Sequence, residues 1–444
     1  MDKYTKATIL ISIFIVSIII NFFIIIGTFG TTDIGMFMGW TYSYFRVGFW
    51  RGFAWHSTYP HLMDLIFYLS GKLTLLFGRP VGETLNIAII KAMTYSVFAG
   101  LSLLLLKVSI PKKFLIQLLM ILFLLNPAIV INASVLAYTD SYYIFSLILC
   151  LFLLYKIEKS KYKENLAMLA VWVILIVSPF LKWQFLVLLP VLSILSLCLA
   201  MKKDLLKSVV LGIVVGVLIV FLPLVKTPSL NDIQIKTGIV FMSFYKITHE
   251  RFVTADFSNV WQLVQYFRYN NLSLTSSPKE IISHITERTP NWVNYSYSVK
   301  GRSLFFFFFA IFLFTVVLKI RTFKKIVISD LTTGLVLWSN FIYVMFNTAV
   351  HENHFMPAVA ISAFIFAKYP SLRTFILYSF LTIINFANLS FFYGLSEKGF
   401  FGIDYHLNFF GLNLSILIAV TLVIFFLYQY FRLLKTNDSL LGWK

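Results

Sequence analysis

The sequence predicts an all-α, polytopic membrane protein. Of its 444 residues, 59% are hydrophobic and only 12% are charged, and the mean hydropathy is +0.85. A composition this apolar excludes a water-soluble globular protein. Apolar runs long enough to cross a bilayer recur along the whole chain, so we expect a single transmembrane domain over residues 1–444.

Twelve apolar runs predict about 12 transmembrane helices. They lie near residues 8–28, 84–106, 114–132, 138–155, 165–181, 184–200, 207–226, 303–318, 326–347, 354–367, 372–394 and 408–431. The runs at 165–181, 303–318 and 354–367 are short for a full crossing. An even number of crossings is therefore better determined than the number twelve itself. No small-residue cleavage site follows the first run, which predicts a retained signal anchor.

Positive charges fall on one side of the predicted membrane. The formal net charge of +19 would indicate a nucleic-acid partner in a soluble protein, but in a membrane protein Lys and Arg mark the cytoplasmic loops. A cytoplasmic N-terminus puts these groups inside: Lys3/Lys6, Lys107/Lys112/Lys113, Lys156/Lys159/Lys161/Lys163, Lys202/Lys203/Lys207, Lys319/Arg321/Lys324/Lys325, Lys368/Arg373 and Arg432/Lys435. We therefore expect both termini in the cytoplasm, the lipid bilayer as a partner and no nucleic acid. Abundant Lys, Ile, Asn and Phe suggest a bacterial source, and hence the inner (cytoplasmic) membrane.

Two long connections, residues 29–83 and 227–302, are predicted to lie outside the cytoplasm. The first interleaves aromatic and polar residues, which is typical of helices lying in the membrane interface. The second is long enough for a small cap of helices but not for an independent domain. The two cysteines, Cys150 and Cys198, lie within apolar runs, so neither a disulfide framework nor a thiolate metal site is expected.

Two carboxylates stand where apolar runs meet the predicted outer surface. Asp33 follows the first run and could act as a general base for a hydroxyl acceptor, or it could cap the helix that follows. Asp140 opens the fourth run just after Asn126-Pro127 breaks the third. It could bind a donor phosphate through a divalent cation, Mg²⁺ or Mn²⁺, as a cofactor, or it could be an N-cap.

Two tight outer hairpins carry further candidates for binding a phosphate-bearing donor. Lys182 and Gln184 lie in the first, where the positive-inside rule disfavours lysine, so the cation suits a lipid-linked phosphate better than simple snorkelling. His351, Glu352 and His354 lie in the second. The spacing of this group does not match HEXXH, so a zinc hydrolase is not expected, and the alternatives are a polar turn or a donor contact.

The first loop adds a group of candidate substrate-binding residues. His56, Tyr59 and His61 combine polar edges with an aromatic face, a composition that suits a glycan. Arg46 and Arg51 could contact a phosphate, or they could be snorkelling residues on interfacial helices.

The order of these clusters resembles the GT-C superfamily of integral-membrane glycosyltransferases, which use polyprenyl-phosphate sugars. Asp33 resembles the acidic residue of the first loop in that superfamily, and Tyr59-Pro60-His61-Leu62 looks like its Tyr-Pro-Pro-Leu stretch. The stretch from Asn126-Pro127 to Thr139-Asp140-Ser141 is similar to its Asn-Pro…Thr-Asp-Ser segment. Leu181-Lys182-Trp183-Gln184…Leu189-Pro190 resembles its Lys-Pro-Gln…Leu-Pro hairpin, and His351-Glu352-Asn353-His354-Phe355-Met356-Pro357 resembles its His-Glu-Arg-Tyr…Pro stretch.

The resemblance implies an inverting transfer from a polyprenyl-phosphate sugar to a cell-envelope glycan or lipid-linked acceptor. Asp33 would be the catalytic base, and Lys182, with Asp140, would stabilise the departing polyprenyl phosphate. The chain departs from the pattern where Asn353-His354 replaces Arg-Tyr, which removes a basic contact to the donor phosphate, and where His61 and Trp183 replace prolines.

Two other functions suit a chain of this kind. A polysaccharide polymerase acting on polyprenyl-diphosphate-linked glycans would be expected to have arginine-rich outer loops. A lipid or sugar transporter should show inverted repeats or charges at the bilayer midplane, and Lys91 is the main charge within a predicted span.

Overall fold

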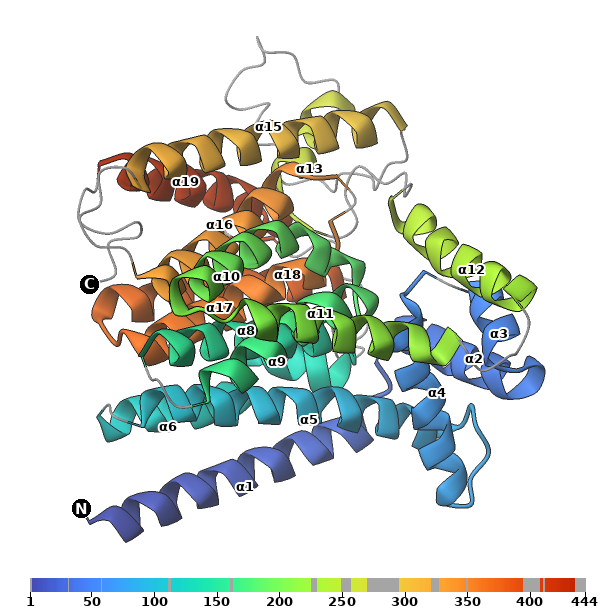
Figure 1. Ribbon diagram of the computed structural model, residues 1–444. Coiled ribbons are helices and arrows are strands. Elements are labelled where there is room, and N and C mark those ends of the chain that lie inside the picture. Colours follow the sequence, from blue (N-terminus) through green and yellow to red (C-terminus); the bar gives the residue numbers. More distant parts are fainter. Residues whose placement is uncertain are drawn as a thin grey trace. The chain divides into compact units, whose positions relative to one another are not determined.

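The protein is an all-helical, polytopic membrane protein. A computed structural model describes residues 2–30, 32–56, 58–110, 113–159, 163–224, 230–248, 257–269, 295–320, 327–348, 350–393, 408–409 and 412–435, and helices make up nearly all of them (Figure 1). These residues form two compact units. Unit 1 comprises Met1–His249, Val327–Thr333 and Ala363–Pro370, and unit 2 comprises Glu250–Ile326, Gly334–Ser362 and Ser371–Lys444. Each unit is described by itself, and the expectation of a single domain stays a prediction.

Unit 1 contains the first twelve α-helices and several short helices between them. The α-helices are α1 (Lys3–Gly27), α2 (Thr32–Val47), α3 (Phe49–His56), α4 (His61–Leu76), α5 (Thr84–Ser109), α6 (Phe114–Leu122), α7 (Pro127–Ile129), α8 (Asp140–Lys159), α9 (Glu164–Val177), α10 (Leu189–Lys203), α11 (Leu206–Phe221) and α12 (Leu230–Thr248). The short helices are η1 (Phe123–Leu125), the π-helix η2 (Val130–Val135), η3 (Ser178–Phe180), η4 (Trp183–Val187) and η5 (Leu222–Leu224).

Unit 2 contains the later helices and a small hairpin. It comprises α13 (Val260–Tyr269), α15 (Tyr295–Ile320), η6 (Glu352–Phe355), α18 (Leu372–Tyr393) and α19 (Leu414–Lys435). Strands β1 (Asn408–Phe409) and β2 (Leu412–Asn413) pair antiparallel and directly precede α19 in the chain. Helices α16 (Ile328–Phe346) and α17 (Met356–Lys368) contribute residues to both units.

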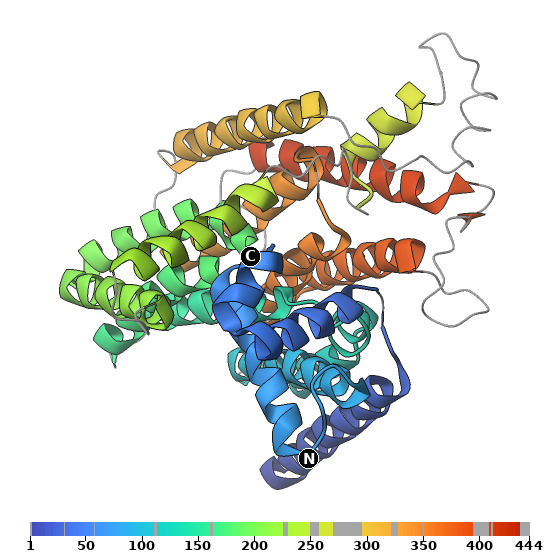
Figure 2. The same ribbon diagram turned by 90° about the vertical axis from the view of Figure 1, so that its right-hand side faces the viewer.

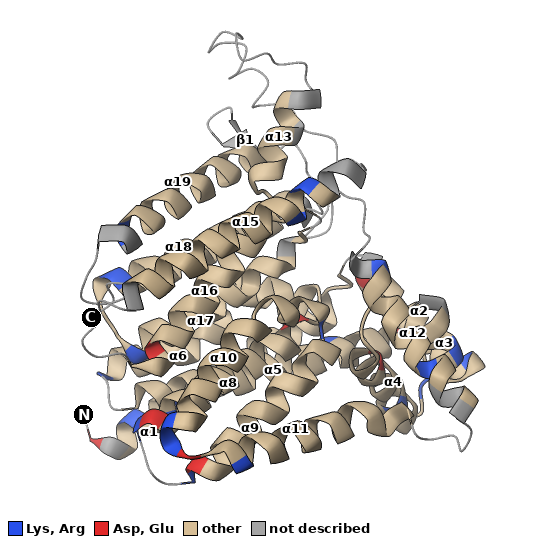
Figure 3. Cartoon of the chain, turned by 45° about the horizontal axis from the view of Figure 1, so that its top comes forward, with Lys and Arg blue, Asp and Glu red and all other residues tan. Residues whose placement is uncertain are grey.

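Eight helical stretches in the described part of the chain are long and apolar enough to cross a membrane. They are Tyr4–Gly27, Thr84–Ser109, Phe114–Val135, Asp140–Lys159, Leu206–Leu224, Val299–Leu318, Leu372–Phe391 and Leu414–Arg432. The predicted runs at 165–181, 184–200, 326–347 and 354–367 correspond to α9, α10, α16 and α17, which are shorter or less apolar. The membrane class is thus confirmed, whereas a count of twelve crossings stays a prediction. Figure 3 shows charged residues mainly near helix ends, with long uncharged stretches between them.

Helix α1 runs alongside α5 and α6 in unit 1 (Figure 1). Its 25 residues correspond to a length of about 37 Å, enough to span the hydrocarbon core. Only 17% of its most apolar stretch is buried within the protein, against 61% for α8. Most of the surface of α1 is therefore available to lipid.

Helices α9 and α11 pack closely because α11 presents two glycines four residues apart. A Cβ at Gly212 would lie 2.7 Å from the carbonyl oxygen of Leu169, and one at Gly216 would lie 2.7 Å from the Cβ of Ile176. Small residues at this spacing let membrane helices approach each other closely. The contact fixes α9, which leads directly into the hairpin that carries Lys182.

The first-loop helices α2, α3 and α4 enclose an aromatic core and face the viewer in Figure 2. Phe37, Trp40, Tyr44, Phe53 and Phe67 are buried there, and the rings of Phe37 and Phe67 stack with centroids 4.8 Å apart. The loop 29–83 therefore holds three packed helices; their expected position in the membrane interface stays a prediction. Of the second loop, 227–302, the described residues comprise α12, α13 with the three residues before it, and the start of α15.

A carboxylate from α8 caps the beginning of α16 within unit 1. The oxygens of Glu158 accept hydrogen bonds from the backbone N–H groups of Ile328 at 2.8 Å and Ser329 at 2.9 Å. The first N–H groups of a helix lack partners within the helix, so a carboxylate at this point stabilises the terminus. Nearby, Asp330 pairs with Lys368 at 2.6 Å.

Candidate functional site

The connection from α1 to α2 approaches the segment before Asp140 at Gly30, three residues before Asp33. Gly30 has φ +103°, and a Cβ there would lie 2.8 Å from the carbonyl oxygen of Val135 and 2.7 Å from the Cδ1 of Ile34. Both the left-handed backbone and the close approach require glycine at this position. Asp33 follows in the first turn of α2 and is half-buried.

The segment that leads to Asp140 folds in an unusual way because Asn126-Pro127 ends the preceding helix. The side chain of Asn126 accepts a hydrogen bond from the N–H of Ala128 at 3.0 Å, and the π-helix η2 follows. Ala137 is fully buried with φ +53°, a conformation that costs an L-residue on the order of 1 kcal/mol. Such strain persists where the surroundings fix it, and here it sets the direction in which α8 begins at Asp140.

Lys182 lies between η3 and η4 with an extended backbone, and its side chain reaches α8. Its Nζ is 3.3 Å from Oδ2 of Asp140 and donates a hydrogen bond to Oγ1 of Thr139, also at 3.3 Å. The same Nζ lies 4.2 Å from the centroid of the Tyr59 ring. The structure therefore brings together three residues that the sequence suggested separately: Lys182, Asp140 and Tyr59. We call these three residues with Thr139 the lysine cluster.

The charges of the lysine cluster act on one another and on Asp33. Burial lowers the pKa of Lys182, but Asp140 and Tyr59 act in the opposite direction and hold this pKa above its ordinary value. Burial raises the pKa of the Tyr59 hydroxyl; Lys182 lowers it, and the carboxylates of Asp140 and Asp33 raise it further. Lys182 is therefore a cation and Tyr59 a neutral phenol at neutral pH, and Asp33 is near enough to influence that phenol.

The surroundings of Asp140 bear on the expected divalent metal ion. A hard cation needs several oxygen ligands around it, but one oxygen of Asp140 already faces the ammonium group of Lys182. In the described part of the chain no three His, Cys, Asp or Glu residues gather in a group that could hold a metal ion. The positive charge that the structure shows beside Asp140 is that of Lys182, and the expected Mg²⁺ or Mn²⁺ stays a prediction.

The other unit 1 candidates lie around or away from the lysine cluster. Gln184 is half-buried in η4. His61 is buried, with its Nε2 2.9 Å from the carbonyl oxygen of Val220, and burial lowers its pKa, so it packs α4 against α11 as a neutral ring. Arg46 and Arg51 are exposed on α2 and α3. The side chain of His56 lies outside the described residues.

The predicted histidine hairpin belongs to unit 2. His351 precedes η6, and its backbone N–H donates to Nδ1 of His354 at 3.2 Å. His354 is 3% exposed, and its carbonyl oxygen accepts from the side chain of Asn340 at 3.3 Å. These bonds form a polar turn, and a contact of this turn with a donor stays a prediction. The side chain of Glu352 lies outside the described residues.

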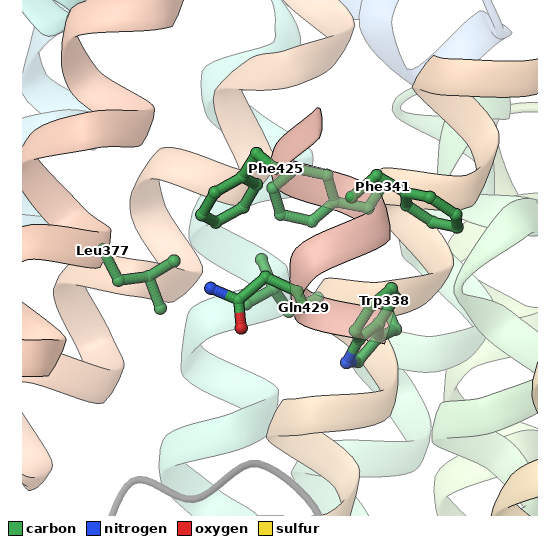
Figure 4. A pocket seen from close by; sticks show the side chains of 7 residues that line it. Trp338, Phe341, Leu377, Phe425 and Gln429 are labelled. Atoms are coloured by element: carbon green, nitrogen blue, oxygen red, sulfur yellow. The ribbon is translucent and has the colours of Figure 1, made fainter. Parts of the chain in front are cut away.

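Two cavities differ in what they could hold. In unit 2 a cavity of about 30 Å³ lies among Trp338, Phe341, Leu377, Phe425 and Gln429 (Figure 4), with room for about one water molecule. In unit 1 an apolar cavity of about 230 Å³ lies beside the lysine hairpin. It is lined by His61, Phe180, Trp183, Leu186, Val220, Phe221, Leu224, Thr237, Val240, Phe241 and Phe244.

Sequence reasoning missed a buried acid on α4. Asp64 on α4 is 1% exposed, and the buried hydroxyl of Tyr44 on α2 is close enough to change its pKa. Burial raises the pKa of Asp64 well above its ordinary value, and the nearby hydroxyl of Tyr44 lowers it in part. A carboxylate among apolar residues (Leu62-Met63-Asp64-Leu65-Ile66) was the signal in the sequence.

Comparison with known proteins does not assign a family. The chain matches no protein-family model and no curated protein. The likeness to GT-C enzymes therefore rests on the order of the motifs.

Proposed function

We propose that the protein is a GT-C-like glycosyltransferase. It would move a sugar from a polyprenyl-phosphate donor to a cell-envelope glycan or lipid-linked acceptor on the outer face of the bacterial inner membrane. The observation that carries the proposal is the lysine cluster, in which the buried ammonium group of Lys182 lies 3.3 Å from Asp140 and over the ring of Tyr59. Three motifs spread over the first half of the chain thus meet, which separate helix caps would not require.

Asp33 is proposed as the general base. Its carboxylate takes the proton of the acceptor hydroxyl while the acceptor oxygen bonds to the anomeric carbon of the donor sugar. The bond between that carbon and the phosphate oxygen breaks, and polyprenyl phosphate leaves with the bonding electron pair. Attack opposite the leaving group inverts the anomeric centre.

Lys182 is proposed to stabilise the departing phosphate. An ammonium group has three N–H donors, and two acceptors, Asp140 and Thr139, are in place. The ring face of Tyr59 covers another side of the ammonium group. A phosphate oxygen that took the place of this ring would contact a fixed positive charge in a buried site. Asp140 is then a positioning residue that keeps Lys182 charged and oriented, with no metal ion required.

The apolar cavity beside the hairpin supports a lipid-linked donor. Phe180 and Trp183, which line it, belong to the hairpin that carries Lys182, so a polyprenyl chain in this cavity would lie beside that hairpin. The described residues that line it include no charged side chain, which suits a polyprenyl chain.

The test is a transfer assay with the full-length protein in detergent. Radiolabelled polyprenyl-phosphate hexoses and a cell-envelope extract are offered to wild type, Asp33→Asn and the exposed control Lys72→Gln. We expect label in the acceptor with wild type and with Lys72→Gln. Asp33→Asn should transfer the sugar at least about 100-fold more slowly, which is the loss of rate expected when a general base is removed. Full activity of a folded Asp33→Asn protein would remove Asp33 as the base.

The same assay tests the role of metal ions and the rival functions. Because Lys182 supplies the charge at Asp140, we expect chelation with EDTA to leave the rate unchanged; a loss restored by Mg²⁺ or Mn²⁺ would contradict this assignment. Polymerisation of diphosphate-linked glycans without transfer from monophosphate donors would instead identify a polymerase. Uptake of an intact lipid or sugar into vesicles without transfer would identify a transporter.

A further inference from the structure

Lys91 is a buried cation for which the proposed reaction has no use. It lies in α5 with no exposed surface, and its Nζ donates to Oγ1 of Thr28 at 2.9 Å and to the backbone oxygen of the same residue. Both acceptors are uncharged. Among the residues that the structure describes, no carboxylate pairs with Lys91. A buried charge without a counter-charge is strongly unfavourable, and one within a membrane segment indicates a functional site.

A cleft of about 620 Å³ lies at the residue that Lys91 binds. Thr28 is part of its wall, and the other lining residues come from the end of α1, the start of α5 and the turn between α4 and α5. They are Ile25, Ile26, Gly27, Phe29, Arg79, Glu83, Thr84, Leu85, Ile87 and Ala88. Most of this wall is apolar, and its polar groups gather on the side of α5.

The charge of the cleft favours an anion. Arg79 is exposed and makes no ion pair with any described residue, and the first N–H groups of α5 add a partial positive charge. Glu83 supplies one carboxylate, but its side chain forms no capping hydrogen bond. Lys91 does not line the cleft, but it lies directly behind the lining residue Thr28, so its charge adds to that of Arg79 against the single carboxylate of Glu83.

We propose that this cleft binds the phosphate headgroup of a membrane lipid, with the lipid chain lying along α1. The phosphate would accept hydrogen bonds from Arg79 and from the N-terminus of α5, and it would supply the counter-charge that Lys91 lacks. The acyl chain of the lipid would continue over Phe22 and Ile26, which are 54% and 56% exposed. A free phosphate ion would leave the apolar wall uncovered, so the lipid is the better fit. The inference does not depend on the proposed transferase activity.

The test measures lipid binding and not turnover. Delipidated full-length protein is titrated with dioleoyl phosphatidic acid, with dioleoylglycerol, which has the same chains without the phosphate, and with inorganic phosphate, using native mass spectrometry. The variants are Arg79→Gln and Lys91→Met, and the control is Lys72→Gln on an exposed lysine of the same loop. A thermal melt of each variant with and without phosphatidic acid gives a second readout.

We expect phosphatidic acid to bind wild type and Lys72→Gln equally, and Arg79→Gln about tenfold more weakly. Dioleoylglycerol should bind weakly to all variants alike. Phosphatidic acid should raise the melting temperature of wild type but not that of Lys91→Met. Should Lys91→Met fail to fold, Arg79→Gln, which changes an exposed residue, decides alone. Equal binding of both lipids, no effect of Arg79→Gln, or full competition by inorganic phosphate would each overturn the proposal.

Discussion

Lys182 and Asp140 are both buried, with side-chain exposures of 5% and 1% and charged atoms 3.3 Å apart. Removing one member of such a pair leaves the other charge buried without its partner, whereas removing both avoids that penalty. Lys203 and Glu164 form a shorter pair at 2.8 Å, but it is more exposed, at 26% and 15%. Water screens that pair and weakens it.

We therefore predict that Lys182→Met destabilises the protein by about 3–5 kcal/mol, and that Lys182→Met/Asp140→Asn destabilises it less. Lys203→Met, the control, should lower stability by less than about 1 kcal/mol. Denaturant or thermal unfolding in detergent measures all three. A double variant as unstable as the sum of its single changes would show that the two charges do not depend on each other.

Asp64 predicts a pH dependence of stability. Burial raises its pKa in the folded protein well above the ordinary value of 3.8, so the folded state binds a proton that the unfolded state releases. Its contribution is complete below pH 3.8 and is lost as the pH rises toward the folded-state pKa. Asp64→Asn carries no titrating proton. It should raise the melting temperature at neutral pH and flatten its decline as the pH rises above 3.8.

The control for Asp64 is Asp204→Asn, which changes an exposed carboxylate at a left-handed position that asparagine also tolerates. It should leave the pH profile of the melting temperature unchanged. An Asp64→Asn profile parallel to that of wild type would mean that Asp64 is ionised in the folded protein.

At the scale of helices, the contact between α9 and α11 depends on two missing side chains. We predict that Gly212→Ala and Gly216→Ala each destabilise the protein by about 1–3 kcal/mol, because a methyl group would overlap the facing helix. Gly238→Ala on α12 is the matched control. Nothing lies within 4 Å of its added methyl group, so it should be neutral or stabilising by up to about 1 kcal/mol. Thermal unfolding checks all three; equal effects would mean that the helix contact is not close.

The sequence allowed some elements to be predicted better than others. Lengths of apolar runs located α1, α5 and α19 because lipid exposure demands a continuous apolar surface. The run at 114–132 instead divides into α6, η1, α7 and the π-helix η2. Asn126-Pro127 marked the break, but a π-helix leaves no periodicity of its own that could have been recognised.

The candidate site was predictable as a set of residue types, not as a geometry. Asp140 and Lys182 stood out because charges at the ends of apolar helices are rare. Their pairing over Tyr59 depends on how α4, α8 and the hairpin pack, which no local pattern encodes. The buried positions of Asp64 and Lys91 depend on packing in the same way.

On the scale of the whole molecule, the predicted orientation can be tested by labelling single cysteines. In a Cys198→Ser background, Lys72→Cys on α4 should react with a membrane-impermeant maleimide on intact cells. Asp204→Cys, between α10 and α11, should react only after the membrane is permeabilised, because the positive-inside rule places that loop in the cytoplasm. The opposite pattern would invert the topology and move the lysine cluster to the cytoplasmic side.

The bond from Glu158 to the start of α16 joins residues 170 positions apart. A ribosome adding 5–20 residues per second needs roughly 10–30 s to make that stretch. During this time α8 has been synthesised but the N–H groups that Glu158 will bind have not. Closing this part of unit 1 is therefore a late event in biogenesis, and a ribosome that stalls before residue 328 leaves a nascent chain with an unfinished fold.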